Sequence, residues 1–380
     1  MLKMKYFKKI PYGHQTIDKT DIDSVISALS SDWLTQGPKV REFEDDLARI
    51  VTAKYCVAVS SGTAALHLAC LAAGIGIGDE VIVPTLSFVA SANCALYVGA
   101  IPVLCDVDPD NLTIDVEKAE KKITKRTKAI IGVDFAGQSA NWEKLRELAQ
   151  KYKLILIDDA AQSIGSKHKN KPIGSWADLT AFSFHPVKTI TTGEGGAVVT
   201  NNKNYYEQIV KLRHHGIEKN SARETWQYDV NELGYNFRLT DIQAALGISQ
   251  LKRLGRFISK RRSLWKRYAQ NLKEVEGLKL PKEAVGNFSA WHIYPIQLDP
   301  GFIKKGRNAV FRELTQAGIG VQVHYKPIHL LSLYRKLGYK KGDFPVAEKY
   351  FENTITIPLY PSLLRKDQDY IIRKVKESLK

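Results

Sequence analysis

The sequence has few cysteines and no paired cysteine motif. Cys56, Cys70, Cys94 and Cys105 are the four among 380 residues, and none belongs to a C-x-x-C pair. Because each lies in an apolar stretch, we expect buried free thiols in a reducing compartment rather than a disulfide framework. The sequence therefore predicts a cytoplasmic protein, and it predicts no metal site.

No stretch of the chain has the pattern of a secretion or membrane segment. Residues 1–10 are basic but have no apolar core, so they do not predict a signal peptide. The longest run of small apolar residues, 64–78, is interrupted by His67 and several glycines and is too short to span a bilayer. Internal repeats and low-complexity segments are also missing. We therefore expect no membrane partner.

Acidic residues are outnumbered by basic ones. The chain has 56 Lys and Arg against 40 Asp and Glu, which gives a net charge of +16. Such a charge fits nucleic acid, a membrane surface or an anionic small substrate. The basic residues are scattered, however, and no recognition-helix or zinc-finger pattern accompanies them. We interpret the charge as solvated surface that also steers phosphorylated ligands, and nucleic-acid binding stays a minor alternative.

Strand-like and helix-like patterns alternate from residue 55 onward. Short apolar runs predict strands at 55–60, 80–84, 101–107, 129–135 and 154–158. Amphipathic or small-residue runs between them predict helices at 62–73, 89–97, 116–122 and 142–151. This order predicts an α/β fold with a mainly parallel sheet and helices on both faces. Ligands of such sheets bind beyond the carboxyl ends of the strands.

The length exceeds that of one typical domain, so we expect two lobes. The predicted parts are an irregular arm at 1–20, a large domain at 21–255 and a smaller domain at 256–380. The elements predicted outside the alternating region are a helix at 21–30 with Thr20 as its N-cap, a helix at 40–48, one long basic helix at 243–272 that joins the lobes, and short strands at 292–298 and 320–324.

One lysine stands in an unusual setting within residues 181–196. An aromatic strand precedes Lys188, Pro186 stiffens the chain, and glycines at 193, 195 and 196 allow close backbone approach. A lysine is by default a solvated surface charge. In a dry place it loses its proton readily, and a neutral amine forms a Schiff base with an aldehyde.

Two further stretches suit the cofactor pyridoxal phosphate (PLP). An apolar strand at 154–158 ends in Asp158 and Asp159, and a turn of small residues at 60–66 leads from a strand into a helix. PLP needs a lysine, a carboxylate on its ring nitrogen and a cradle for its phosphate. Either acid could supply the carboxylate, and alone the turn is equally well explained as a helix start capped by Ser60 or Ser61.

Five more stretches make the chain resemble the PLP-dependent sugar aminotransferases of the fold-type I, aspartate aminotransferase-like group. They are WLTQGP at 33–38, VDFAG at 133–137, FHPVK at 184–188, GYNFR at 234–238 and VHYKP at 323–327. The resemblance covers nearly the whole chain. Within the family it points to the enzymes that aminate C4 of a UDP-sugar in pseudaminic acid biosynthesis. It implies a mixed, mainly parallel sheet in a PLP-binding large domain and a smaller C-terminal α/β domain.

The resemblance implies roles for the cofactor residues. Lys188 carries PLP and moves the proton, Asp159 rather than Asp158 keeps the ring nitrogen protonated, and Gln162 bonds to the ring hydroxyl oxygen. Phe88 stacks on the ring, and His185 packs nearby. The phosphate is held by Gly62, Thr63, Ala64, Ser183 and, from the other subunit of a homodimer, Asn236. For each of these residues a purely structural role, as a cap or as core packing, is the alternative.

The resemblance also implies the substrates. L-Glutamate gives its amino group to a UDP-linked 4-keto-6-deoxy-N-acetylhexosamine, in a ping-pong reaction. The residues implied in substrate binding are Tyr12, Asp32, Trp33, Leu34, Thr35, Gly62, Ser183, Asn236, Gln322, Val323, His324 and Tyr325.

Three other functions stay open. A sugar 3-dehydratase of the same fold replaces the lysine by histidine, so Lys188 argues against it. A transferase that makes a 3-amino sugar or acts on a dTDP-linked keto sugar is not strongly excluded. A DNA-binding regulator built on the PLP fold needs an appended domain, for which the arm before residue 20 is too short.

Overall fold

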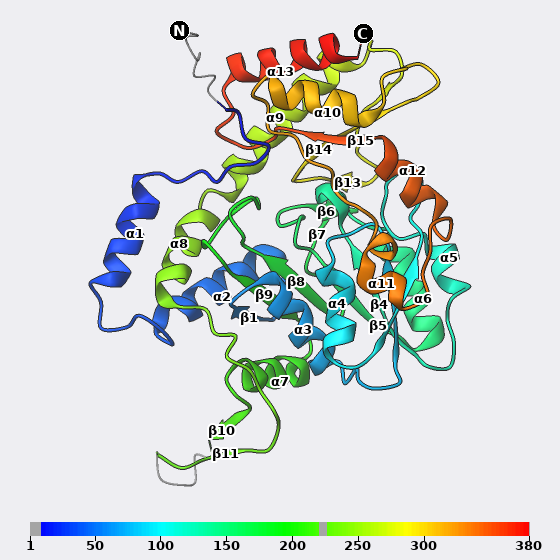
Figure 1. Ribbon diagram of the computed structural model, residues 1–380. Coiled ribbons are helices and arrows are strands. Elements are labelled where there is room, and N and C mark those ends of the chain that lie inside the picture. The colour runs from blue at the N-terminus through cyan, green and yellow to red at the C-terminus, as the bar shows by residue number, and fades with distance from the viewer. Residues whose placement is uncertain (1–8, 220–225, 380) are drawn as a thin grey trace.

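The computed structural model describes residues 9–219 and 226–379 (Figure 1). Of the predicted arm, residues 1–8 lie outside this range. Residues 9–18 are not helical, and Ile10 is bridged to Ile319. No helix in the described ranges is long and apolar enough to cross a membrane. All four cysteines are buried free thiols, as predicted.

A seven-stranded mixed sheet forms the centre of the molecule, in the order β1-β9-β8-β5-β4-β2-β3. Its strands are β1 (Tyr55–Val59), β2 (Glu80–Pro84), β3 (Ile101–Cys105), β4 (Thr127–Val133), β5 (Ile155–Asp159), β8 (Leu179–Ser183) and β9 (Gly196–Thr200). Neighbours from β8 through β5, β4 and β2 to β3 are parallel, whereas β9 is antiparallel to both β1 and β8. The predicted α/β fold with a mainly parallel sheet is therefore confirmed.

Helices cover both faces of this sheet. One layer holds α3 (Gly62–Ala72), α4 (Ala90–Tyr97) and α7 (Lys203–Arg213). The other holds α2 (Pro38–Val51), α5 (Val116–Glu120), α6 (Trp142–Tyr152) and α8 (Asp241–Leu251). In β1, Val57 and Val59 join the first apolar cluster, while Cys56 and Ala58 join the second. This alternation is the two-residue repeat of a strand that is buried on both faces.

A second, smaller sheet with its own helices lies above the main sheet in Figure 1. A three-stranded sheet in the order β12-β14-β15 packs with α9 (Leu254–Leu272), α10 (Arg307–Gln316) and α13 (Arg365–Ser378) around one apolar cluster. Its strands are β12 (Leu278–Lys279), β14 (Tyr294–Leu298) and β15 (Thr354–Ile357). The predicted strand at 320–324 is wrong, because only Gln322 makes a bridge there, to Thr356. The boundaries predicted at residues 20 and 255 stay a prediction.

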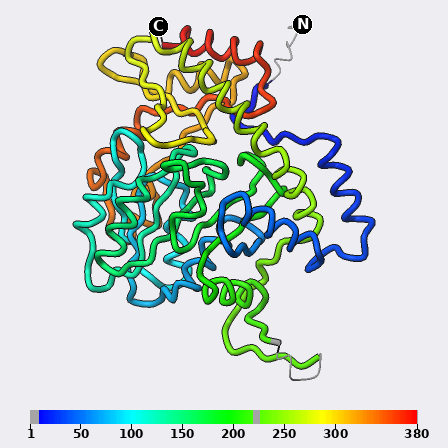
Figure 2. The backbone as a smooth tube through the Cα atoms, turned by 180° about the vertical axis from the view of Figure 1, so that it is seen from behind, coloured from blue at the N-terminus to red at the C-terminus, as the bar shows by residue number. Residues whose placement is uncertain are grey.

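The single helix predicted at 243–272 is also wrong, because α8 ends at Leu251 and α9 begins at Leu254. Arg253 lies at the break and forms ion pairs with Asp18 and Asp21. These acids belong to the start of α1 (Lys19–Leu29), which lies beside α8 in both views (Figures 1 and 2). The N-cap of α1 is Asp18 and not the predicted Thr20, since the Asp18 carboxylate accepts the backbone N–H groups of Thr20 and Asp21.

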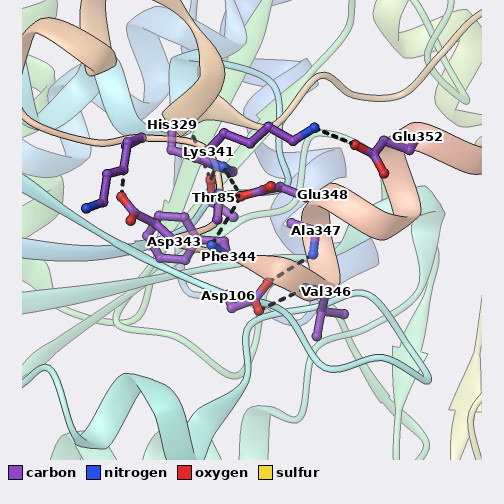
Figure 3. A network of polar contacts seen from close by, with 12 residues as sticks. Thr85, Asp106, His329, Lys341, Asp343, Phe344, Val346, Ala347, Glu348 and Glu352 are labelled. Atoms are coloured by element: carbon purple, nitrogen blue, oxygen red, sulfur yellow. Dashed lines mark hydrogen bonds and ion pairs between the residues drawn. The ribbon is translucent and has the colours of Figure 1, made fainter.

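Polar contacts fasten the C-terminal part of the chain to the main sheet (Figure 3). The carboxylate of Asp106 accepts the backbone N–H groups of Val346 and Ala347, at 3.1 and 3.0 Å, in the first turn of α12 (Pro345–Asn353). The buried imidazole of His329 lies between Thr85 Oγ1, at 2.7 Å, and Glu348 Oε1, at 2.9 Å. Residue Thr85 directly follows β2, so this network holds the loop that leaves that strand.

The remaining elements are short. They are η1 (Phe135–Gly137), β6 (Lys167–His168), β7 (Lys171–Pro172), β13 (Asn287–Phe288), η2 (Ile328–Leu330) and α11 (Ser332–Lys336). A hairpin of β10 (Ile217–Lys219) and β11 (Tyr228–Val230) projects away from the body in both views (Figures 1 and 2).

Candidate active site

A cavity of about 340 Å³ lies at the carboxyl ends of β5 and β8. Ten residues predicted from the sequence line it: Tyr12, Gly62, Thr63, Phe88, Asp159, Gln162, Ser183, Lys188, His324 and Tyr325. They come from segments that are up to 313 positions apart in the chain, and the sheet edge brings them together. His185, expected near the cofactor, also lines the cavity.

Lys188 lies in the loop that joins β8 to β9. Its backbone N–H donates to the carbonyl of His185 at 2.9 Å, which forms a tight turn behind the side chain. Burial lowers the pKa of Lys188 to about 8, against the opposing attraction of the Asp159 carboxylate. Near neutral pH this amine is therefore deprotonated far more often than an ordinary surface lysine, whose pKa is about 10.4.

Asp159 ends β5 and is 5% exposed. Its Oδ2 accepts the hydroxyl of Ser91 at 2.5 Å, and its Oδ1 accepts the backbone N–H of Ala161 at 3.2 Å. Burial raises the pKa of this carboxyl, while both hydrogen bonds and Lys188 oppose the rise. Of the two acids considered from the sequence, only Asp159 lines the cavity; Asp158 is fully buried and its oxygens have no hydrogen-bond partner among the described residues.

An anion cradle forms where β1 turns into α3. Ser61 is the N-cap of α3, and its hydroxyl accepts the backbone N–H of Ala64 at 3.1 Å. The N–H groups of Gly62 and Thr63 have no acceptor in the described chain, and both residues line the cavity. A Cβ on Gly62 would lie 2.8 Å from the Cβ of Ser183, so glycine keeps this corner open. Free N–H groups at a helix N-terminus bind phosphate.

The opposite wall is aromatic and polar. Gln162 accepts the backbone N–H of Ala136 at 2.9 Å and donates to the hydroxyl of Tyr325 at 3.3 Å. His324 bonds to Thr356 Oγ1 at 2.9 Å, and burial followed by the nearby Lys188 charge lowers its pKa to about 4. Tyr12 packs against that imidazole with ring centroids 5.5 Å apart. This wall is therefore uncharged at neutral pH and offers hydrogen bonds to a neutral ligand.

Several predicted residues do not reach the cavity within one chain. Ala64 is buried in α3, with its N–H taken by Ser61. Gln322 is exposed and bridged to Thr356, and Val323 is half-buried. Asp32, Trp33, Leu34 and Thr35 form an exposed loop that is bridged to Thr240 through Thr35, and Asn236 is an exposed residue bridged to His214. Thr240 is the N-cap of α8.

Three polar residues of the cavity were not predicted from the sequence: Ser87, Glu194 and His292. His292 follows Trp291, whose φ of +49° is rare for a bulky residue. The fully buried Arg261 donates to the carbonyls of His292 and Leu359, each at 2.9 Å. Burial, followed by the charges of Lys188 and Arg261, lowers the pKa of His292 well below its usual value.

These groups suit PLP. A lysine with a lowered pKa suits its aldehyde, a buried carboxylate with open acceptor positions suits its ring nitrogen, and the N–H groups at the start of α3 suit its phosphate. Within residues 9–219 and 226–379, no cluster of His, Cys, Asp or Glu could hold a metal ion.

Comparison with known proteins shows the family of the chain. Residues 15–376 match the model of the DegT/DnrJ/EryC1/StrS aminotransferase family. The spore coat polysaccharide biosynthesis protein SpsC of Bacillus subtilis is 40% identical over 98% of this chain and 97% of its own length. The UDP-4-amino-4,6-dideoxy-N-acetyl-beta-L-altrosamine transaminase of Campylobacter jejuni, serotype O:23/36, is 41% identical over 95% of each chain.

Solved structures match the fold equally well. Helicobacter pylori PseC, an aminotransferase involved in the biosynthesis of pseudoaminic acid, superposes with a TM-score of 0.93 at 34% identity over 98% of this chain and 99% of its own. Spr1654 from Streptococcus pneumoniae in its PLP-form gives 0.92 at 33% identity over 98% of each chain. Family match and relatives extend over nearly the full length of the chain. The chain belongs to the DegT/DnrJ/EryC1/StrS aminotransferase family.

Proposed function

We propose that this enzyme moves an amino group from L-glutamate to C4 of a UDP-linked 4-keto-6-deoxy-N-acetylhexosamine. The support for aminotransfer is the family match, and the support for the sugar is the 41% identity to the Campylobacter jejuni transaminase together with the likeness to PseC. The cofactor is pyridoxal phosphate, because the cavity residues suit it and the neighbouring Spr1654 structure is a PLP-form. The four buried thiols favour a cytoplasmic enzyme.

The residues that would hold the cofactor are those of the cavity. Lys188 would bind its aldehyde, Asp159 its ring nitrogen and Gln162 its ring hydroxyl oxygen, while Phe88 would stack on the ring. Gly62, Thr63 and Ser183 would hold the phosphate, whereas the N–H of Ala64 is already bonded to Ser61 and would not take part. This set is supported by the lowered pKa of Lys188, by the burial of Asp159 and by the open N–H groups at the start of α3.

Bound PLP withdraws electrons from the carbon that loses its proton, and the chain supplies the acid and base. In the first half of the reaction, Lys188 Nζ would take the proton from the α carbon of L-glutamate. The amino group would stay in the site, and water would supply the keto oxygen of the departing 2-oxoglutarate. In the second half, the same nitrogen would give a proton to C4 of the sugar, which would gain the retained amino group, lose its keto oxygen as water and leave as the 4-amino sugar. A lysine with a pKa of about 8 suits both directions, because it gains and loses a proton near neutral pH.

We further propose a homodimer in which each subunit completes the other's site. Asn236 and the loop at 32–35 lie outside the cavity in a single chain and are exposed. The outer face of α1 exposes Ile22, Ile26 and Leu29, each about half accessible, and Trp33 and Leu34 continue this apolar surface. A contiguous apolar surface of this kind fits a protein interface. The substrate would then contact Tyr12, His324 and Tyr325 from one subunit and Asp32, Trp33, Leu34, Thr35 and Asn236 from the other, with Gln322 and Val323 at the rim.

One incubation distinguishes the proposed substrate from the alternatives. The PLP-loaded enzyme is incubated with L-glutamate and one keto sugar at a time. The sugars tested are UDP- and dTDP-linked, with the keto group at C4 or at C3. We expect 2-oxoglutarate and a 4-amino sugar, seen by mass and NMR, with the UDP-linked N-acetylated 4-keto sugar as the best acceptor. Amination at C3, or preference for a dTDP-linked sugar, would favour the alternatives.

A further inference from the structure

Two neighbouring carboxyl groups at the end of β5 have opposite surroundings. Asp159 receives hydrogen bonds from Ser91 Oγ at 2.5 Å and from the backbone of Ala161 at 3.2 Å. Asp158 is fully buried, and neither of its oxygens has a partner among the described residues. A buried carboxylate without donors is strongly destabilised, whereas donors favour the charged form. The hydrogen bonds therefore select Asp159 as the acid that carries the charge.

The only side chain that donates to Asp159 within the described chain is that of Ser91. It comes from α4, 68 positions earlier in the sequence, and it is fully buried. Its oxygen also lies 2.6 Å from Ser87 Oγ and 3.1 Å from the carbonyl of Phe88. A hydroxyl has one proton, and the charged carboxylate is the strongest of the three acceptors. Ser87 then donates to Ser91, and Ser91 donates to Asp159.

The loop that leads to Ser91 is held at its start. Residues 85–89 connect β2 to α4 and carry Ser87 and Phe88. At the start of the loop, Thr85 is held by His329, which is held in turn by Glu348 (Figure 3). The loop is therefore anchored to the C-terminal part of the chain, and Ser91 transfers that rigidity to the carboxylate.

We propose that Ser91 is a positioning residue for the aminotransferase reaction: its hydroxyl orients the carboxylate of Asp159 and stabilises its negative charge, so that the carboxylate can bond to the ring nitrogen of the cofactor. This inference rests on the proposed function, in which Asp159 is the acid at that nitrogen. Burial opposes the charge on Asp159, while Lys188 favours it; the Asp159 charge in turn helps to raise the pKa of the buried Asp158. Without Ser91, one backbone N–H and Lys188 would remain to support the charge.

The test measures protonation of the cofactor's ring nitrogen directly. Wild type and Ser91→Ala are loaded with PLP that is ¹⁵N-labelled in the ring, and the ¹⁵N NMR shift is recorded with kcat and KM. We expect the Ser91→Ala signal to move toward that of an unprotonated pyridine. We also expect kcat to fall roughly tenfold, the effect of removing one hydrogen bond to a charged group. Ser91→Thr keeps the hydroxyl and should restore both readouts.

The control is Ser378→Ala, which removes another buried serine hydroxyl, one that bonds to Val375 O in α13, far along the chain from the cavity. It should leave the ¹⁵N shift and kcat unchanged. A wild-type ¹⁵N shift in Ser91→Ala overturns the inference, even if kcat falls, because the loss would then be a general effect of the cavity left by the hydroxyl.

Two further outcomes are decided by separate measurements. If Ser91→Ala does not retain PLP, the Asp159 carboxyl is titrated in the apoprotein by infrared spectroscopy, with Asp159→Asn to assign its band. A midpoint higher than in wild type supports the inference, and an unchanged midpoint overturns it. If the ring nitrogen of the wild-type enzyme is itself unprotonated, the proposed role of Asp159 fails, and the role of Ser91 fails with it.

Discussion

Asp159 is paired with Ala181 across the parallel strands β5 and β8. Because the strands run in the same direction, both end at the same edge of the sheet. The chain leaves β8 two residues after Ala181, at Ser183, and Lys188 follows in the next loop. This register brings an acid and a lysine from separate motifs into one cavity. It also explains why the charge of the Asp159 carboxylate acts to raise the pKa of Lys188, against the effect of burial.

The lowered pKa of Lys188 predicts how the apoprotein captures PLP. Only the neutral amine attacks an aldehyde, so the rate should rise with pH and level off above about 8. An ordinary lysine would give a midpoint near 10.4. The rate is followed by the absorbance of the bound cofactor after mixing. Asp159→Asn removes a charge that raises the pKa of Lys188, so its midpoint should lie lower than in wild type. A wild-type midpoint above about 10 would contradict the burial of this amine.

Gly62→Ala should weaken PLP binding without unfolding the protein. The added Cβ would lie 2.8 Å from Ser183 Cβ, at the corner where the phosphate is expected. Overpacking of this kind costs about 1–3 kcal/mol, which corresponds to roughly a 5- to 150-fold increase in the dissociation constant. The affinity is measured by titrating the apoprotein with PLP. The control is Gly74→Ala, because a Cβ at Gly74 would meet nothing within 4 Å. The φ of +66° at Gly74 adds backbone strain there, but this strain is unrelated to the cofactor, so the PLP affinity should stay that of wild type. Equal affinities for Gly62→Ala and wild type would place the phosphate elsewhere.

Hybrid dimers should reveal a shared active site. Lys188→Ala and Asn236→Ala are each expected to be inactive or strongly impaired as homodimers, since one would remove the proposed base and the other the proposed phosphate contact from the partner subunit. When the two variants are mixed and reassembled, one site of each hybrid dimer has both residues intact. Activity should therefore return to about one quarter of the wild-type level at equal mixing, because half of the dimers are hybrids with one working site. No recovery in dimers shown to have exchanged subunits would mean that Asn236 serves its own chain.

Arg261 should contribute more to stability than its neighbour Arg262. Arg261 is fully buried and donates to three backbone carbonyls, including that of His292 in the cavity wall. Arg261→Met leaves these carbonyls without a donor and should lower the free energy of unfolding by about 3 kcal/mol. Arg262 is partly exposed, is paired with Glu283 and donates to one backbone carbonyl, that of Ser289, so Arg262→Met should cost less, about 1–2 kcal/mol. Both values come from denaturant unfolding of the apoprotein. Equal costs would show that the buried carbonyls find other partners.

Charge removal at Asp159 should affect turnover more than cofactor binding. Asp159→Asn keeps the shape of the side chain and the bond from Ser91, but it loses the charge that would hold the ring nitrogen protonated. We expect kcat to fall by about 10²- to 10³-fold, as for other preorganised electrostatic groups. Steady-state kinetics with L-glutamate provide the measurement, with Asp158→Asn as the control. A larger loss in Asp158→Asn than in Asp159→Asn would reverse the assignment of the two acids.

Local patterns were sufficient for much of the main sheet. The ends of β1 to β5 lie within two residues of the prediction, because each is a short apolar run bounded by turn residues. The insertion of β9 between β1 and β8 was not predictable, since antiparallel pairing of Cys56 with Val199 leaves no mark on either segment. The break between α8 and α9 depends on Arg253 and its ion pairs to acids more than 230 positions away. The spacing of apolar residues within the helix carries no information about such distant partners, so the break could not be predicted from it.

The same distinction applies to the site. Lys188, Asp159 and the 60–66 turn were predicted because each lies in a local motif. The edge of the sheet then brings the three segments together around one cavity. His292 has no motif, and it reaches the cavity through the positive φ of Trp291 and the carbonyl contacts of Arg261. Ser91 was missed because its partner Asp159 is 68 residues away. Asn236 and the 32–35 loop show the opposite case, a family motif whose residues do not reach the cavity in one chain.

The most direct test of the account is to identify the residue that binds the cofactor. The PLP-loaded enzyme is treated with borohydride, which makes the bond between lysine and cofactor permanent, then digested and sequenced by mass spectrometry. We predict a single modified peptide with the cofactor mass on Lys188, and none after prior incubation with L-glutamate. Modification of a different lysine, or of several lysines equally, would contradict the central claim.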